Sequence, residues 1–353
     1  MDLQTLWFLL IAVLWTGYFV LEGFDFGVGM LLPFVPRDSE QRKTAIETIG
    51  PVWDGNETWV VVAGGATFAA FPAWYGTMFS GFYIALLLIL VFLIVRVVSF
   101  DWSERRESSR WRSAWWGANT VGSFGAALIW GVALANLLHG VPLDSNGDYS
   151  GDFLDLFSPY TVFAGIAVAL LFAFHGATFL TLRTSGELLE RARRAARTLS
   201  IPAAAVAAAF LAWTVAVAVD RNDKDVFPPL LPALVGIAAL VLAVVFVIAG
   251  RSGWSFLMTA VGTIALVATL FTSLYPRVMV SSPDFANSLT VDNASSSHYS
   301  LTVMTVVALI VTPVVLLYQG WTYYVFRRRL GLTESAPGPE NAPIAPAAEG
   351  PTG

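Results

Sequence analysis

Cysteine and charged residues are what this sequence lacks. It has no cysteine, which excludes a disulfide framework, a thiolate metal site and a cysteine-ligated iron–sulfur cluster. Only 13% of its 353 residues are charged, against roughly 25% in an ordinary soluble domain. The net charge of −5 gives no reason to expect a nucleic-acid partner. No Lys or Arg precedes Arg37, so the N-terminal segment lacks the basic start of a cleaved signal peptide and is expected to be retained as a helix.

Long apolar runs take the place of the missing charges. Each run is about 20 residues long, enough to cross ~30 Å of hydrocarbon. The runs cover residues 6–32, 52–71, 76–98, 115–138, 160–182, 201–219, 230–249, 256–274 and 301–326. The sequence therefore predicts an all-α polytopic membrane protein over residues 1–330, with about nine transmembrane helices in helical bundles. Residues 331–353 are rich in Pro and Ala without an apolar period, and are predicted to be a disordered cytoplasmic tail.

The positively charged residues fall on one set of connections between these runs. All 20 Lys and Arg residues belong to that set except Arg221, Lys224 and Arg277. Because Lys and Arg are retained on the cytoplasmic side, this alternation predicts an N-terminus outside and a C-terminus in the cytoplasm.

Two acids lie inside the first predicted span. Glu22 and Asp25 are three residues apart and hence on one helix face. A charged group near the bilayer centre costs at least ~2.5 kcal/mol, so an acid at that depth indicates function. The spacing of Gly23 and Gly27 lets another helix approach closely. We therefore expect both acids to face protein and not lipid.

Two further acids, Asp54 and Glu57, lie at the start of the second predicted span. An antiparallel neighbour would bring them into the same half of the membrane as Glu22 and Asp25. Carboxyl groups arranged from an aqueous face into the bilayer predict a proton intake path. Because this pattern also occurs in proton-coupled transporters, it does not by itself define the function.

Structural interpretations of these residues stay open beside the functional one. Asp54 as N-cap and Glu57 as N3 would form a capping box that satisfies the first amides of the helix. Glu22 could equally hydrogen-bond a neighbouring helix. Asp25 lies too deep in its span for capping, which favours function. Arg96, at the end of the third predicted span, is expected to extend to the interface.

Histidine is scarce as well. Of the three histidines, only His175 lies well inside a predicted span. Since a bis-histidine haem site would need two, His175 is predicted to be a hydrogen-bonded core residue. The sequence has no Gly-rich phosphate loop, catalytic triad or metal-ligand cluster, so neither a catalytic residue nor a metal site is predicted in this chain.

Two motifs carry a family resemblance. Residues 23–29 (GFDFGVG) and 50–59 (GPVWDGNETW) resemble subunit II of cytochrome bd-type quinol oxidases. Shorter matches follow at 71–75, 136–142 and 300–305. The resemblance extends over nearly the whole chain to about residue 328.

The resemblance implies a haem-free second subunit of a terminal oxidase in the bacterial cytoplasmic membrane. In this family subunit I, the expected partner, carries the quinol site and the haems, two of b type and one of d type. Subunit II supports it, and small accessory subunits are a further option. The family's buried acids are thought to deliver cytoplasmic protons to the site that reduces oxygen to water, and by motif these acids are Asp25 and Asp54. Some members also hold a quinone in subunit II, for which no residue is assigned here.

Glu22 and Glu57 depart from the family pattern, in which a shorter acid and an amide are familiar at these positions. Two other classes of function use the same acids. One is a proton-coupled secondary transporter, although the repeated halves with broken helices that are typical of transporters are not found. The other is a purely structural membrane subunit in which the acids serve only as caps and helix contacts.

Overall fold

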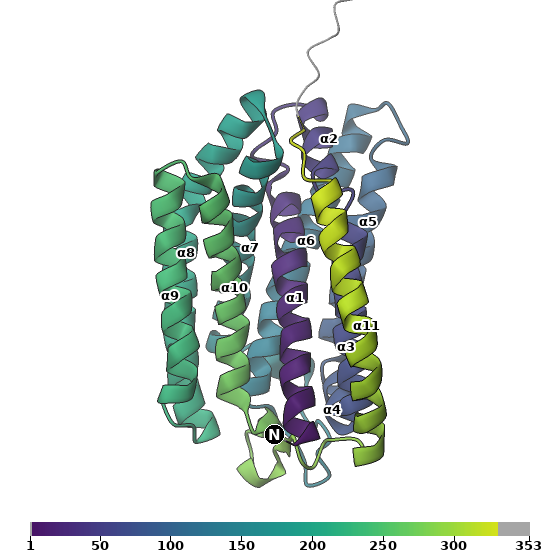
Figure 1. Ribbon diagram of the computed structural model, residues 1–353, viewed down its shortest axis with the longest axis vertical. Helices are drawn as coiled ribbons and strands as arrows, with labels where there is room; N and C mark the ends of the chain where they lie inside the picture. Colours follow the sequence, from purple (N-terminus) through teal and green to yellow (C-terminus); the bar gives the residue numbers. More distant parts are fainter. Residues whose placement is uncertain (1, 331–353) are drawn as a thin grey trace, which may run out of the picture.

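The computed structural model describes residues 2–330, so the predicted tail at 331–353 lies outside the described residues. Within them the chain forms eleven α-helices and a minor sheet (Figure 1). The helices are α1 (Leu3–Leu31), α2 (Ser39–Glu47), α3 (Trp53–Ala70), α4 (Pro72–Gly81), α5 (Tyr83–Trp102), α6 (Ser109–His139), α7 (Pro159–Arg183), α8 (Gly186–Asn222), α9 (Phe227–Ile248), α10 (Ser252–Leu274) and α11 (His298–Val325). Short 3₁₀ turns, η1 (Phe153–Leu156) and η2 (Phe285–Asn287), and the strands β1 (Arg277–Met279) and β2 (Leu289–Thr290) complete the description.

The predicted all-α membrane architecture is confirmed. Eight of the helices in residues 2–330 are long and apolar enough to cross a membrane. The short helix α3 is not among them, because its first turns carry the polar residues Asp54, Asn56 and Glu57. Its 18 residues still extend about 27 Å, and it packs along α1. The total of nine spans stays a prediction.

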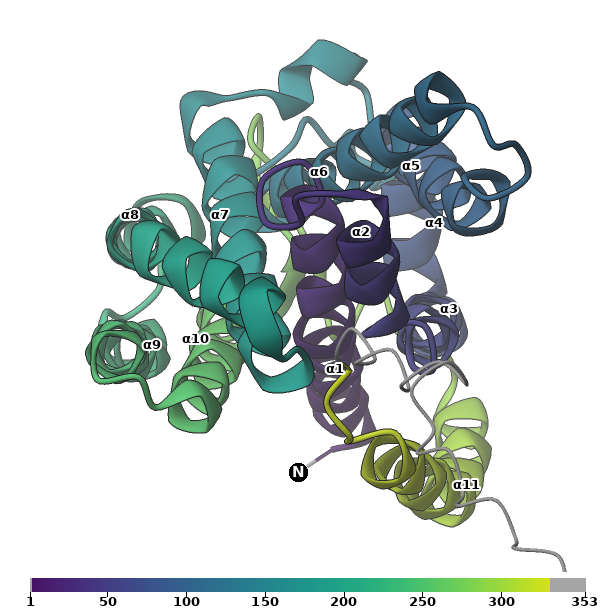
Figure 2. The ribbon, with the colours of Figure 1, turned by 90° about the horizontal axis from the view of Figure 1, so that it is seen from above.

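Helix α1 lies at the centre of the molecule. It contacts α3, α6, α7, α10 and α11, and seen from above α7–α10 lie on one side of it and α3–α5 on the other (Figure 2). Helix α11 is peripheral, and Leu301 is its one buried residue among those described. The part of α1 from Glu22 to Leu31 is buried throughout, so the side chains that it carries are surrounded by protein.

Two helices differ from the predicted spans. The third span begins earlier than expected, at Pro72 in the first position of α4, where its missing N–H does no harm, and the helix is interrupted at Phe82 before α5. Helix α8 starts at Gly186 and not at residue 201, and has 37 residues. At ~1.5 Å per residue it is about 55 Å long, well beyond the hydrocarbon thickness. Hydropathy identified only its apolar part, because its first turns are rich in arginine.

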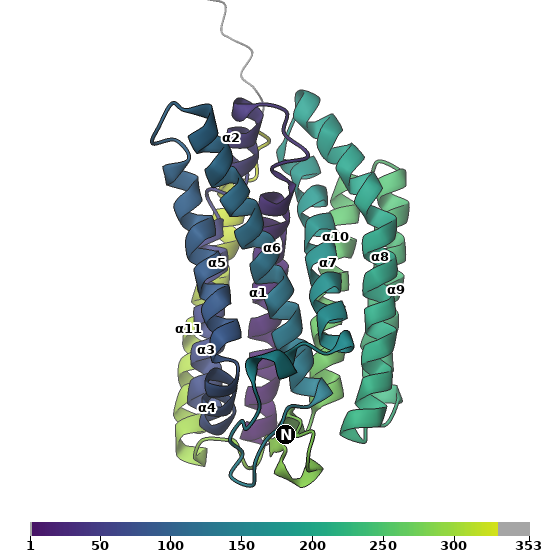
Figure 3. The ribbon, with the colours of Figure 1, turned by 180° about the vertical axis from the view of Figure 1, so that it is seen from behind.

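The connections alternate between the two ends of the bundle as the charge pattern predicts. The arginine-bearing links α1–α2, α5–α6, α7–α8 and α9–α10 gather at the upper end in Figures 1 and 3. The N-terminus and the small antiparallel β1–β2 sheet lie at the opposite end.

Glycines allow α1 and α7 to meet backbone to backbone. A Cβ built on Gly27 would clash with the carbonyl oxygen of Phe172 and lie 2.7 Å from the Cα of Gly176. The expectation of a close helix approach at Gly23 and Gly27 is confirmed, since a Cβ on Gly23 would come within 2.7 Å of the Phe172 ring.

Replacing Gly27 by alanine should destabilise the protein. We expect Gly27→Ala to cost about 1–3 kcal/mol, because the added methyl group must separate two backbones that cannot yield. The melting temperature of the purified protein in detergent checks this. Gly117→Ala on α6 is the matched control, since no atom lies within 4 Å of its built Cβ and alanine is the better helix former by ~1 kcal/mol. If both variants had the same melting temperature as the unchanged protein, the close contact between α1 and α7 at Gly27 would be contradicted.

Candidate functional site

Asp25 is fully buried on α1. Its Oδ2 accepts a hydrogen bond of 2.7 Å from the side-chain amide of Asn56 on α3. Its other oxygen, Oδ1, is buried without a hydrogen-bond partner among residues 2–330. The expectation that this acid faces protein and not lipid is confirmed, and one of its oxygens is free to take up or release a proton.

Asn56 connects three helices at this acid. Its Nδ2 also reaches the carbonyl of Leu21 on α1 at 3.3 Å. Its Oδ1 accepts from the Tyr323 hydroxyl at 2.7 Å and from Gln319 Nε2 at 3.1 Å, both on α11. Sequence reasoning did not select Asn56, although it stands between the two acids of the WDGNETW motif and is the residue of that motif that contacts Asp25.

Glu22, one turn before Asp25, is also fully buried and forms an ion pair with Arg96 on α5. The Arg96 guanidinium carbon lies 4.9 Å from the centroid of the Phe26 ring and 5.8 Å from that of Phe100. The expectation that Arg96 extends to the interface is wrong. Helix α5 continues to Trp102, so Arg96 lies about 9 Å inside its end and meets its counter-charge within the bundle.

Asp54 and Glu57 occupy different environments on α3. Asp54 is exposed, whereas Glu57 is half-buried. The capping-box interpretation is wrong: Val52 is the N-cap residue, and no side chain caps this helix. Glu57 lies three residues after Asp54, hence on the same face of α3, and is less exposed than Asp54.

The described structure therefore brings three of the four predicted acids near Arg96 and leaves Asp54 on the surface. The charges of Glu22 and Asp25 both interact with Arg96. Two fully buried carboxyl groups thus lie near one fully buried guanidinium, which forms an ion pair with Glu22 and not with Asp25. Because an uncompensated charge is expensive in such an interior, the electrically neutral form of this group holds one proton. The arrangement can store a proton and exchange it.

His175 is committed to hydrogen bonds inside the bundle. Its Nδ1 is 2.7 Å from Thr259 Oγ1 and its Nε2 is 3.2 Å from the carbonyl oxygen of Val20. Its ring stacks on Phe256 with 4.6 Å between centroids. The core-histidine prediction is confirmed.

The other two histidines lie near helix ends, where His139 stacks on Tyr160 and His298 is exposed at the start of α11. In residues 2–330 no group of three or more His, Cys, Asp or Glu side chains could hold a metal ion. A haem iron needs an axial ligand with a free donor atom, and both ring nitrogens of His175 are already engaged within this chain.

Comparison with known proteins gives concordant matches. Residues 3–326 match the family model described as "Cytochrome bd terminal oxidase subunit II". The chain is 40% identical over 338 residues to "Cytochrome bd ubiquinol oxidase subunit 2" of Bacillus subtilis (strain 168), covering 94% of this chain and 98% of that protein. It is 35% identical over 356 residues to "Cytochrome bd-I ubiquinol oxidase subunit 2" of Escherichia coli (strain K12), covering 91% and 93%.

A solved structure shares the fold. A chain in "The structure of bd oxidase from Geobacillus thermodenitrificans" superposes with a TM-score of 0.73 at 17% sequence identity, covering 92% of this chain and 97% of that one. At this identity the likeness concerns the fold alone.

Removing the guanidinium of Arg96 should destabilise the protein more than removing the whole ion pair. Arg96→Gln leaves Glu22 buried without its counter-charge, and we expect a loss of about 3–5 kcal/mol, read as lower yield and melting temperature. The double variant Glu22→Gln/Arg96→Gln should recover most of that loss.

The exposed pair between Glu190 and Arg193 (2.6 Å, side chains 60% and 39% exposed) provides the control. Glu190→Gln should change stability by less than about 1 kcal/mol. A double variant no more stable than Arg96→Gln alone would show that charge balance is not what the pair provides.

Proposed function

The chain belongs to the cytochrome bd terminal oxidase subunit II family, and from this we propose that its buried acids deliver protons to the oxygen-reducing site of the complex. It is a subunit of a quinol oxidase, an oxidoreductase that contains haem, and a multi-pass protein of the bacterial inner membrane. Family membership confirms the terminal-oxidase hypothesis over the secondary transporter. The role of the acids is the part that stays a proposal.

The haems, of b and d type, are assigned to subunit I. Support comes from His175, whose two ring nitrogens are both engaged in hydrogen bonds within this chain. Haem supplies electron transfer and oxygen reduction when bound in subunit I. The contribution left to the present chain is to hold its partner and to move protons.

Graded burial of the four acids supports a route for protons. Asp54 is exposed at the start of α3, Glu57 is half-buried one turn further, and Glu22 and Asp25 are fully buried on α1. The order runs from the arginine-bearing end of the bundle toward its interior, and we take that end as cytoplasmic. Protons would enter at Asp54, pass Glu57 and reach Asp25.

Asp25 carries the main weight of the proposal. Glu22 has Arg96 as its ion-pair partner, whereas Asp25 has only a neutral amide donor on one oxygen and no partner on the other among residues 2–330. The exchangeable proton of the neutral group therefore belongs on Asp25. When that proton passes toward subunit I, Asp25 is left as a carboxylate near the positive charge of Arg96. The Asp25 carboxylate then takes up the next proton.

We propose that subunit I packs over α11 and the outer face of α3. Helix α11 exposes apolar side chains along its length, and it is tied to α3 by Gln319 and Tyr323 at Asn56. Asp54 is exposed on the adjacent helix. A partner seated here would cover the apolar helix and enclose Asp54, so that the route is completed only in the assembled complex.

Neutralising the acids should slow turnover without dismantling the complex. We expect Asp25→Asn to lower oxygen consumption by roughly 10²-fold, the lower range for a positioned proton-transfer group. Asp54→Asn should lower it less, because Asp54 lies at the start of the proposed route and is not the acid that holds the exchangeable proton. Both variants should retain subunit I and an unchanged visible haem spectrum.

Asp292→Asn is the control, because this exposed acid directly follows β2 and so belongs to the opposite end of the bundle. It should leave oxygen consumption unchanged. Normal turnover in Asp25→Asn and Asp54→Asn would refute the proton route. If the variants lost subunit I but the complexes that remained consumed oxygen at the normal rate, the acids would instead have a purely structural role.

A further inference from the structure

A groove runs along the cytoplasmic part of α8 on the side of the molecule away from α11. It consists of two adjoining hollows of about 490 Å³ and 320 Å³, which share the wall residues Leu31, Phe34 and Leu199. The first lies between the end of α1 and α8, and the second continues between α6 and α7. Helices α6, α7 and α8 face the viewer in Figure 3. We call the two hollows together the α8 groove.

The part of the α8 groove that lies between the end of α1 and α8 is basic. Arg191, Arg194 and Thr198 line it at a spacing of three and four residues, hence on one face of α8. Arg191 is oriented by its Nε, which donates to the carbonyl of Val35 at 2.9 Å. Arg194 is exposed and forms no ion pair within residues 2–330. Two guanidinium groups therefore line this end without a carboxylate between them.

The other end of the α8 groove is apolar and open to the surrounding hydrocarbon. Phe124 of α6 and Ile166 of α7 line it and are 48% and 41% exposed. Phe34, which belongs to both hollows, is 75% exposed. An occupant must therefore be apolar over most of its length and anionic at one end.

We propose that the α8 groove binds one anionic phospholipid of the cytoplasmic leaflet. Its phosphodiester lies between Arg191 and Arg194 with Thr198 as a further hydroxyl donor, and an acyl chain follows Ile166 and Phe124. Basic pockets between membrane helices on the cytoplasmic side are suited to such headgroups. The lipid would fill the space between α1 and α8 and hold the end of the helix that carries Asp25.

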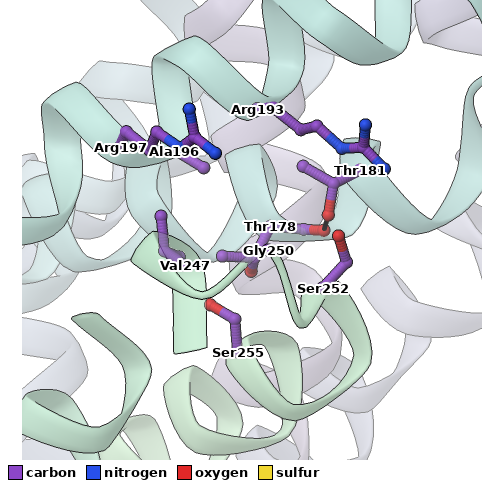
Figure 4. A pocket seen from close by; sticks show the side chains of 9 residues that line it. All are labelled: Thr178, Thr181, Arg193, Ala196, Arg197, Val247, Gly250, Ser252 and Ser255. Atoms are coloured by element: carbon purple, nitrogen blue, oxygen red, sulfur yellow. Dashed lines mark hydrogen bonds between the residues drawn. The ribbon is translucent and has the colours of Figure 1, made fainter. Parts of the chain in front are cut away.

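A neighbouring face of the same helix lines a different hollow and provides a comparison. Arg193 and Arg197 point to a separate hollow at the α9–α10 turn, lined by Thr181, Ser252 and Ser255 among others (Figure 4). Its volume is about 20 Å³, enough for about one water molecule. Arg197 thus carries the same charge as Arg194 and lies on the same helix, but there is no space for an acyl chain beside it.

Native mass spectrometry of the detergent-purified complex, titrated with phosphatidylglycerol after delipidation, tests the site. We expect one tightly bound lipid per complex and about fivefold weaker binding in Arg194→Gln, the weight of one arginine beside an anionic headgroup. Arg197→Gln should bind as the unchanged complex does. Ile166→Trp, which fills the apolar end from an exposed position, should also weaken binding.

Four outcomes would overturn the assignment. Equal weakening by Arg194→Gln and Arg197→Gln would show only diffuse attraction to positive charge. Equal affinity for phosphatidylcholine would remove the requirement for an anionic lipid. Full competition by inorganic phosphate would point to a free-anion site, and a quinone released by Ile166→Trp would make the apolar end a quinone site. Because binding is the readout, none of these results depends on the proton route.

Discussion

The ion pair between Glu22 and Arg96 is the constraint on which the centre of this protein depends. Both side chains are fully buried, and in an apolar interior neither charge is tolerable without the other. The pair links α1 to α5 and engages the guanidinium of Arg96 with Glu22. Asp25, one turn away, is left as the acid without a cation of its own, which is why we propose that it holds the exchangeable proton.

One short segment of α1 serves both packing and chemistry. Gly23 and Gly27 lie on one face and admit α7, while Glu22 and Asp25 lie on the face toward α5 and α3. The glycines and the acids lie on different faces because residues two apart, such as Gly23 and Asp25, differ by about 200° around a helix. The close fit to α7 therefore limits how far α1 can rotate, which in turn keeps the acids aligned with their partners.

Hydropathy and charge were enough to predict the helical membrane fold, because both depend on local sequence. Pairings between helices were not predictable in the same way. Arg96 was assigned to the interface, and Asn56 was overlooked, because their contacts depend on how α1, α3 and α5 are rotated relative to one another. The capping box failed for a local reason: α3 begins after Val52, so Asp54 already lies inside the helix.

The exposure of Asp54 connects the proposed route to assembly. An acid on the outer face of α3, beside the apolar α11, is poorly placed against lipid. A partner that covers this face would remove the acid from lipid and bury apolar surface of α11 in the same step. In the isolated subunit the acids would then lead from the surface to Asp25 and no further. The interaction that assembles the oxidase would also close the proposed proton route, so that proton uptake is linked to the presence of the haems that consume the protons.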